Sequence, residues 1–178
     1  MRIVSGTHKG RQIHPPSNLL VRPTTDFAKE SLFDILVNRV NYDDLNVLDL
    51  FAGTGSISFE FASRGAKDIT SVDMNYKCVE FIRRTAADFG FANIRPVRAN
   101  VLSFLDYCKI KYDLIFADPP YDLNAIITVP DKVMNNQLLN KEGMLILEHS
   151  REQDFTKHPL FTEHRIYGKV NFSFFKQA

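Results

Sequence analysis

The sequence predicts an α/β fold with a seven-stranded, mostly parallel sheet and a β-hairpin appended at the amino terminus. From Asn46 onward, short apolar runs alternate with stretches of helical periodicity, which is typical of a parallel sheet with crossover helices. After Glu148 the pattern changes to two strand-like runs around Gly168, which predicts an edge hairpin. The chain has 178 residues, enough for one sizeable core. We therefore expect a Rossmann-like domain over 26–178, preceded by a basic hairpin and linker over 1–25.

The elements follow in order along the chain. Two short strands, 2–4 and 11–13, flank Gly6 and Gly10, and prolines follow them. A helix over 26–40 is expected because Thr24, Thr25 and Asp26 offer N-cap oxygens to a segment with apolar residues at helical spacing. The predicted strands are then 46–50, 68–73, 94–98, 113–117, 143–148, 162–167 and 170–175, and the predicted helices lie near 56–64, 75–89, 101–108 and 126–136.

Composition excludes several classes of protein. Hydrophobic residues make up 44% and charged residues 24%, as in ordinary folded proteins and unlike disordered or fibrous ones. No apolar run approaches the roughly 18 residues that span a bilayer, and the amino terminus has no secretory-signal pattern. We expect a cytoplasmic protein with no membrane partner. Cys78 and Cys108 form no CxxC pair and have no histidine at ligand spacing, so we expect reduced thiols and no metal.

The charge distribution singles out the first 25 residues. The formal net charge is only +1, but residues 1–25 contain no acidic residue and carry Arg2, Lys9, Arg11 and Arg22. Basic side chains gain free energy by neutralising nucleic-acid phosphates, whatever the base sequence. The same pattern is also found in a simple solvated hairpin. These residues alone leave both interpretations open.

A glycine-containing turn, Asp49-Leu50-Phe51-Ala52-Gly53-Thr54-Gly55, joins a predicted strand to a predicted helix. Open α/β sheets bind ligands at this place, and Gly53 and Gly55 allow the backbone to approach a ligand closely. Asp49 can reach an amino group of that ligand. Ser58 stands where a third glycine would complete a pyrophosphate-binding pattern, so the turn favours S-adenosylmethionine, which has no phosphate.

Further polar residues follow the next two predicted strands. Asp73 can accept hydrogen bonds from both ribose hydroxyls, Met74 can pack on the adenine face, and Asn100 can bond the adenine amino edge. A glycine turn is often only a tight connection, and an aspartate that ends a strand is often only a helix cap. Because all of these residues fall at carboxyl ends of successive strands, the sequence favours a nucleotide-type ligand. The edge hairpin added to the sheet indicates the fold of a class I S-adenosylmethionine-dependent methyltransferase.

The tetrapeptide Asp118-Pro119-Pro120-Tyr121 ends the fourth predicted strand. An exocyclic amine of a base is a poor nucleophile, because its lone pair is delocalised into the ring. The Asp118 carboxylate and the Pro119 carbonyl can accept its two N–H groups, and the prolines preorganise that carbonyl. Tyr121 offers a stacking face for a flipped base, worth on the order of 1–3 kcal/mol. The alternative is that the tetrapeptide has a purely structural role, as a turn stiffened by its prolines with Asp118 as a cap.

The combination of Arg22-Pro23-Thr24-Thr25-Asp26, Leu32-Phe33, the glycine turn, Ser63-Arg64-Gly65-Ala66 and Asp118-Pro119-Pro120-Tyr121 resembles the RsmD family over nearly the whole chain. Its members are bacterial 16S ribosomal RNA guanine-N2 methyltransferases. The resemblance implies S-adenosylmethionine bound by Asp49, Gly53, Gly55, Asp73, Met74 and Asn100, with Thr24 or Thr25 near its carboxylate. It implies that Asp118 to Tyr121 hold the guanine amine.

The same resemblance implies a monomer whose partner is 16S ribosomal RNA, in the small ribosomal subunit or an assembly intermediate, contacted by Lys9, Arg11 and Arg22. The chain departs from the family at Ser58, usually glycine, and at His8-Lys9, usually a Tyr-Arg pair. Two alternatives stay open. One is adenine-N6 methylation of DNA or RNA, because the tetrapeptide recognises an amino group rather than a ring. The other is a non-catalytic RNA-binding assembly factor.

Overall fold

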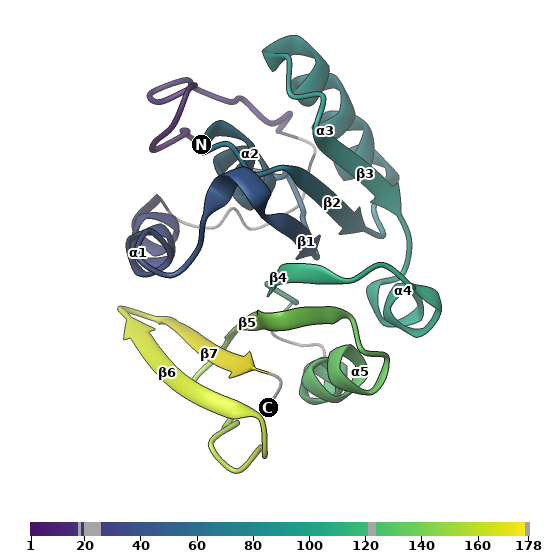
Figure 1. The fold of residues 1–178 in the computed structure, drawn as a ribbon. Helices are drawn as coiled ribbons and strands as arrows, with labels where there is room; N and C mark the ends of the chain where they lie inside the picture. Colours follow the sequence, from purple (N-terminus) through teal and green to yellow (C-terminus); the bar gives the residue numbers. More distant parts are fainter. Residues whose placement is uncertain (18, 20–25, 121–123, 177–178) are drawn as a thin grey trace.

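The computed structural model of the chain describes residues 1–17, 19, 26–120 and 124–176. Seven strands form one sheet in the order β3-β2-β1-β4-β5-β7-β6 (Figure 1). The first five are β1 (Asn46–Leu50), β2 (Asp68–Asp73), β3 (Ile94–Arg98), β4 (Tyr112–Ala117) and β5 (Leu139–His149), and their pairings are parallel. β7 (Val170–Lys176) runs antiparallel between β5 and β6 (Phe161–Tyr167). This is the class I methyltransferase topology, as the sequence predicted.

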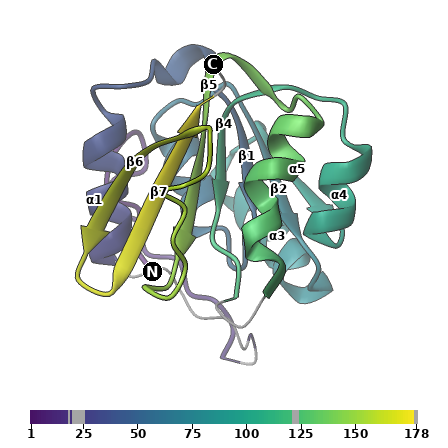
Figure 2. The same cartoon turned by 90° about the horizontal axis from the view of Figure 1, so that it is seen from below.

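Helices cover both faces of the sheet and make two cores (Figures 1 and 2). On one face lie α1 (Asp26–Leu36), α2 (Ser56–Ser63) and α3 (Tyr76–Phe89); on the other lie α4 (Val101–Tyr107) and α5 (Val129–Asn135). Side chains alternate along each strand, so Phe116 joins the first core and its neighbour Ile115 the second. Both strand faces are therefore buried, which explains why the central strands read as continuous apolar runs.

Most predicted elements are confirmed, and the differences lie at their ends. α1 ends at Leu36 rather than residue 40, because a turn follows and Val37 is exposed. The predicted helix 126–136 is a 3-10 helix, η2 (Asn124–Thr128), followed by α5, where Pro130 lies in the first turn and favours a fresh helix start. β5 begins earlier than predicted, at Leu139, which pairs with Tyr112. A short 3-10 helix, η1 (Tyr42–Asp44), was not predicted.

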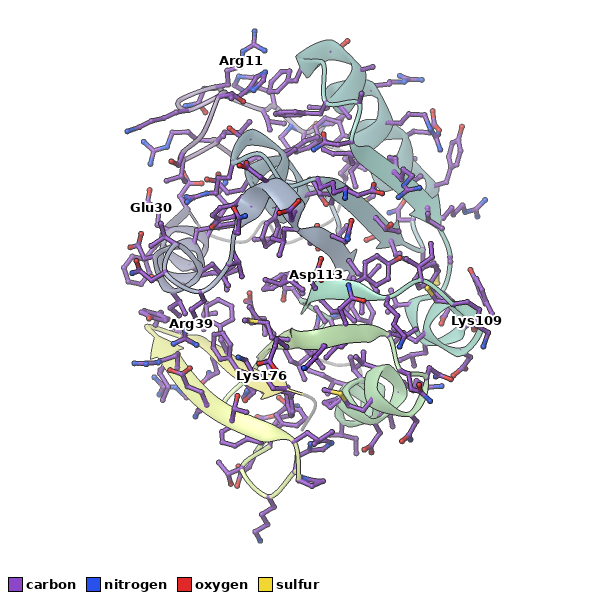
Figure 3. All side chains as sticks on the ribbon, in the orientation of Figure 1. Arg11, Glu30, Arg39, Lys109, Asp113 and Lys176 are labelled. Atoms are coloured by element: carbon purple, nitrogen blue, oxygen red, sulfur yellow. The ribbon has the colours of Figure 1, made fainter. Side chains whose placement is uncertain are left out.

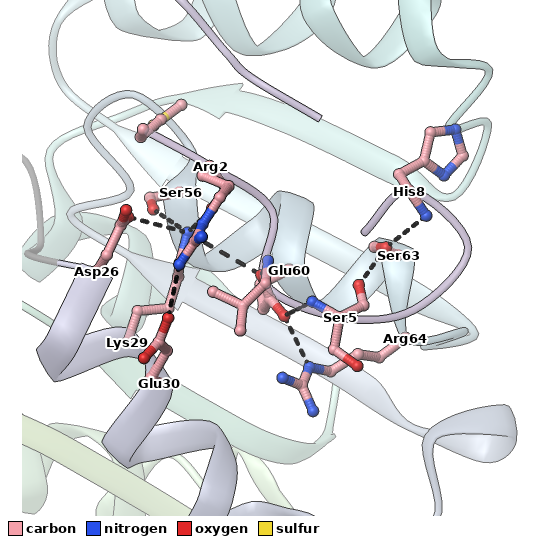
Figure 4. Close-up of polar contacts among 12 residues, drawn as sticks. Arg2, Ser5, His8, Asp26, Lys29, Glu30, Ser56, Glu60, Ser63 and Arg64 are labelled. Atoms are coloured by element: carbon pink, nitrogen blue, oxygen red, sulfur yellow. Dashed lines mark hydrogen bonds and ion pairs between the residues drawn. The ribbon is translucent and has the colours of Figure 1, made fainter. Parts of the chain in front are cut away.

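The amino-terminal hairpin is reduced to a single bridge, Arg2↔Gln12, rather than two regular strands. Its attachment to the domain depends on buried charge (Figure 4). The Glu60 carboxylate is fully buried and accepts the backbone N–H groups of Val4 at 2.7 Å and Ser5 at 3.0 Å. The ammonium group of Lys29 donates to the carbonyl of Arg2 and lies 4.0 Å from Glu60. The hairpin, α1 and α2 are thus joined by one polar network.

Among the helices in the described ranges, none combines the length and the apolar character that crossing a bilayer would require.

Candidate active site at the strand carboxyl ends

The turn between β1 and α2 has an unusual backbone. Phe51, Gly53 and Gly55 have φ angles of 59°, 54° and 77°, in the left-handed region. A Cβ on Gly55 would lie 2.8 Å from Ile82 Cγ1, so glycine is required there by space as well as by conformation. A Cβ on Gly53 would meet only the Phe51 carbonyl oxygen at 3.9 Å, which leaves that side of the turn open. The left-handed Phe51 was not predicted, and such strain is typical of functional sites.

Asp73 at the end of β2 holds the glycine turn in place. Its Oδ2 accepts the Gly53 backbone N–H at 2.8 Å, and its Oδ1 accepts that of Asn75 at 2.7 Å. Each carboxylate oxygen can accept a further hydrogen bond, so both stay able to receive ribose hydroxyls. Met74, next in the chain, is 66% exposed and offers an apolar surface beside Asp73. The ribose and adenine roles fit this geometry and stay predictions.

Asn100 is exposed and caps α4, with its Oδ1 accepting the Ser103 backbone N–H at 3.1 Å. The capping role was not predicted. The side-chain amide group still has two N–H donors, and its proposed contact with adenine stays a prediction.

Asp49 is buried with only 2% of its surface exposed. Its Oδ2 accepts hydrogen bonds from the Ser58 hydroxyl at 2.5 Å and the Ser58 backbone N–H at 3.1 Å. Burial raises the pKa of Asp49 to about 7, hydrogen bonds from Ser58 oppose that rise, and the charges of Asp118 and Asp73 add to it. The carboxylates of Asp73 and Asp118 are therefore close enough to disfavour the charged form of Asp49, an environment suited to a cationic ligand.

The acidic-diproline corner lies beside the glycine turn. β1 and β4 are paired neighbours, with Leu50 opposite Ala117, and the Asp118 backbone N–H donates to the Leu50 carbonyl at 3.4 Å. Pro119 is buried and Pro120 is exposed. The structure thus brings the described part of the tetrapeptide next to the predicted cofactor turn, as the sequence analysis expected. Tyr121 lies outside the described residues, and so do Arg22, Thr24 and Thr25.

Glu148 is a residue of this edge that the sequence reasoning missed. Leu147 of β5 pairs with Ala117 of β4, and Glu148 and Asp118 are the next residues along these two adjacent segments. Glu148 is only 4% exposed, and side-chain alternation along β5 directs it to the same sheet face as Ile146 and Phe116. An acidic residue that ends the apolar run 144–147 was the available signal. The carboxylate of Glu148 therefore belongs to the same edge of the sheet as that of Asp118, on which the predicted chemistry depends.

The basic residues of the hairpin tip lie away from this edge. Thr7 and His8 bond to Ser63, the last residue of α2, through Thr7 N–H to the Ser63 carbonyl at 2.7 Å and His8 N–H to Ser63 Oγ at 2.9 Å. The Arg11 guanidinium lies 4.6 Å from the ring centre of Phe89, the last residue of α3. Both helices start at the cofactor edge, so the exposed Lys9 and Arg11 lie at their far ends, where Figure 3 shows Arg11 on the outer side.

Comparisons with known proteins identify the family of the chain. A family model described as Conserved hypothetical protein 95 matches residues 1–176. Ribosomal RNA small subunit methyltransferase D of Escherichia coli (strain K12) is 28% identical over 180 residues, which cover 99% of this chain and 90% of that protein. The protein of the same name from Buchnera aphidicola subsp. Acyrthosiphon pisum (strain APS) is 30% identical over 152 residues, 85% of this chain and 78% of that one.

A solved structure of a hypothetical protein from Thermus thermophilus superposes with a TM-score of 0.85 at 25% identity, and the match covers 99% of both chains. Likeness thus extends from the hairpin to the edge strands. With its sheet order, its glycine turn and its acidic-diproline corner, the chain belongs to the Conserved hypothetical protein 95 family, the RsmD family that its motifs resemble.

Proposed function

We propose that this protein transfers a methyl group from S-adenosylmethionine to the exocyclic N2 amine of a guanine in 16S ribosomal RNA. The observation that carries the proposal is the contact between the Asp118 backbone N–H and the Leu50 carbonyl. This contact joins the acidic-diproline corner, which would bind the amine, to the glycine turn, which would bind the cofactor. The cofactor fits the turn, because the missing side chain of Gly53 leaves space on the open side and three carboxylates favour a ligand that carries positive charge. S-adenosylmethionine supplies an electrophilic methyl group on a sulfonium.

The chain's own contribution is to prepare the amine. The Asp118 carboxylate and the Pro119 carbonyl accept its two N–H groups, which draws the nitrogen toward tetrahedral geometry and frees its lone pair. The φ angles of Pro119 and Pro120 are fixed by their rings, so little freedom is lost when the base is bound. The methylated amine is acidic while it is cationic, and Asp118 is placed to receive the proton it sheds. No separate strong base is required.

Glu148 supports guanine over adenine as the target. Guanine presents N1–H and N2–H donors on one edge, whereas adenine presents an acceptor at N1 beside its amine. A buried carboxylate near the end of β5, next to Asp118, can accept the N1–H of guanine and would repel the N1 lone pair of adenine. A site built to receive a donor discriminates strongly against a base that presents an acceptor in the same place.

Ribosomal RNA is proposed as the partner because the relatives from Escherichia coli and Buchnera aphidicola, which match this chain over most of their length, carry the name ribosomal RNA small subunit methyltransferase D. The predicted contacts of Lys9, Arg11 and Arg22 with RNA, a monomeric state and a cytoplasmic location belong to the same proposal.

The decisive experiment supplies methyl-labelled S-adenosylmethionine with free 16S RNA, small-subunit particles or DNA, and identifies the labelled nucleoside. We expect N2-methylguanosine from one or both RNA substrates. Label in N6-methyladenine would overturn the guanine assignment, and label in no substrate, with the cofactor bound, would favour the non-catalytic assembly factor.

Asp118→Asn tests the role of the corner in the same assay. Because the amide keeps the shape of the carboxylate but loses its charge and one accepting oxygen, we expect turnover to fall by about 100-fold or more. Cofactor affinity, measured by calorimetry, should stay within about threefold, because loss of the Asp118 charge weakens the attraction for the cation but also eases the ionisation of Asp49, and these two effects oppose each other. Turnover equal to that of the unsubstituted protein would remove Asp118 from the mechanism.

A further inference from the structure

Asp49 is connected to β2 by two buried serine hydroxyls. The Ser58 hydroxyl lies 2.5 Å from Asp49 Oδ2, and the Ser71 hydroxyl, on β2, lies 2.6 Å from that of Ser58. Ser58 and Ser71 have no exposed surface. Asp49, Ser58 and Ser71 belong to β1, α2 and β2, so these two hydrogen bonds connect three elements.

The direction of these hydrogen bonds depends on the protonation state of Asp49. An ionised carboxylate can only accept, so Ser58 must then donate to Asp49 and Ser71 must donate to Ser58. A protonated Asp49 can donate to Ser58, and both serine hydroxyls then turn the other way. In both states Asp49 and Ser58 keep a partner without help from water. The pair of serines is therefore suited to a carboxyl group that changes its charge while buried.

We propose that Ser58 and Ser71 are positioning residues for the cofactor, holding Asp49 in place as it ionises to pair with the ammonium group of S-adenosylmethionine. The inference rests on the proposed function, because it needs that cofactor at the glycine turn. Ser58 stands where the family resemblance gives glycine, which has no hydroxyl and could not make this connection.

The charges around Asp49 fit this role. Asp73 on β2 and Asp118 after β4 both disfavour its charged form, α2 contributes the Ser58 donors, and burial holds the pKa at about 7. A cation at the turn lowers that pKa by attraction, so cofactor binding releases a proton wherever Asp49 was protonated beforehand. Affinity should therefore rise with pH up to about 7 and level off above it.

Ser58→Ala tests the proposal with S-adenosylhomocysteine as the probe, whose dissociation constant is measured by calorimetry at about pH 6 and about pH 8.5. Loss of a hydrogen bond to the charged form should raise the pKa of Asp49 by about one unit. Relative to the unsubstituted protein, affinity should then be about tenfold weaker at the lower pH and within about twofold at the higher one. The comparison at each pH cancels the titration of the probe's own amino group.

Ser71→Ala provides a second variant, with a smaller shift in the same direction because it acts through Ser58. Proton release gives an independent readout from calorimetry in buffers of different ionisation enthalpy. At about pH 7 we expect release to rise from about half a proton per probe in the unsubstituted protein to nearly one in Ser58→Ala.

A purely structural role of the serines predicts the same loss of affinity at both pH values and unchanged proton release. That result would overturn this inference and leave the proposed function standing. Failure of the unsubstituted protein to bind S-adenosylmethionine or the probe at either pH would overturn both.

Discussion

At the scale of single residues, the buried carboxyl group of Asp49 lowers the stability of the fold when it is ionised. Its pKa is raised from 3.8 to about 7 by burial first and by Asp118 and Asp73 next. The folded protein therefore holds a proton that the unfolded chain has lost between those pH values. By linkage, the contribution of Asp49 to stability falls as pH rises through this window and is constant above it. Buried functional groups commonly carry such a cost.

Asp49→Asn should remove this cost, because the amide cannot ionise and can still accept from Ser58. We compare the free energy of unfolding of the variant with that of the unsubstituted protein at about pH 4.5 and at about pH 8. The difference in favour of the variant should be larger at the higher pH by on the order of 1–3 kcal/mol. Urea unfolding at both pH values measures the difference. An equal difference at the two would show that Asp49 does not titrate abnormally. Cofactor affinity should fall, because the negative partner of its ammonium group is gone.

At the scale of elements, the start of α2 and the end of α3 provide a matched pair of glycines. Gly55 and Gly90 have φ angles of 77° and 73°, so alanine meets similar backbone strain at each. A Cβ at Gly90 meets nothing within 4 Å, whereas one at Gly55 meets Ile82 and Phe59, whose side chains are buried in the first core. The two positions differ in space and in their distance from the candidate site.

Gly90→Ala should cost about 1–2 kcal/mol of unfolding free energy, from backbone strain alone, and leave cofactor affinity unchanged. Gly55→Ala should cost at least about 1 kcal/mol more, because Phe59 or Ile82 must shift, and should weaken cofactor binding at least about tenfold. Urea unfolding and calorimetry test both. Equal effects of the two substitutions on affinity would mean that the glycine turn does not hold the cofactor.

At the scale of the whole molecule, the candidate site and the hairpin tip lie at opposite ends of α2 and α3. α3 has 14 residues, which corresponds to about 20 Å. An RNA that reaches both the Asp118 corner and Arg11 would therefore have to extend along the outer surface of these helices. The buried Glu60 and Lys29 network holds the hairpin against α2, so its basic residues keep a fixed position relative to the site.

Reversing both charges, Lys9→Glu with Arg11→Glu, should weaken RNA binding and flatten its salt dependence by about one to two units of slope. The control is Lys109→Glu with Lys111→Glu, an equal change of charge on two exposed lysines between α4 and β4. Figure 3 labels Arg11 and Lys109 in separate regions of the molecule. Filter binding over a range of salt concentrations measures the slopes. If the two pairs of substitutions have the same effect, the hairpin makes no specific contact.

Local sequence patterns determined most of the fold. The limits of β1, β2 and β3 were predicted correctly from short strand-like segments that alternate with helical ones, and the glycine turn and Asp118 corner were found because each lies at the end of a strand. Errors occurred where local signals were weak, such as the end of α1 and the segment around Pro130. Periodicity does not mark where packing stops supporting a helix.

Only the tertiary structure decided which side chains meet at the site. The Ser58 contact with Ser71, the place of Glu148 beside Asp118 and the attachment of the hairpin through Glu60 join residues from separate elements. These contacts depend on strand register and on the face toward which each side chain points. A one-residue change of register would move a side chain to the other face, so such contacts can be stated only when the whole sheet is assembled.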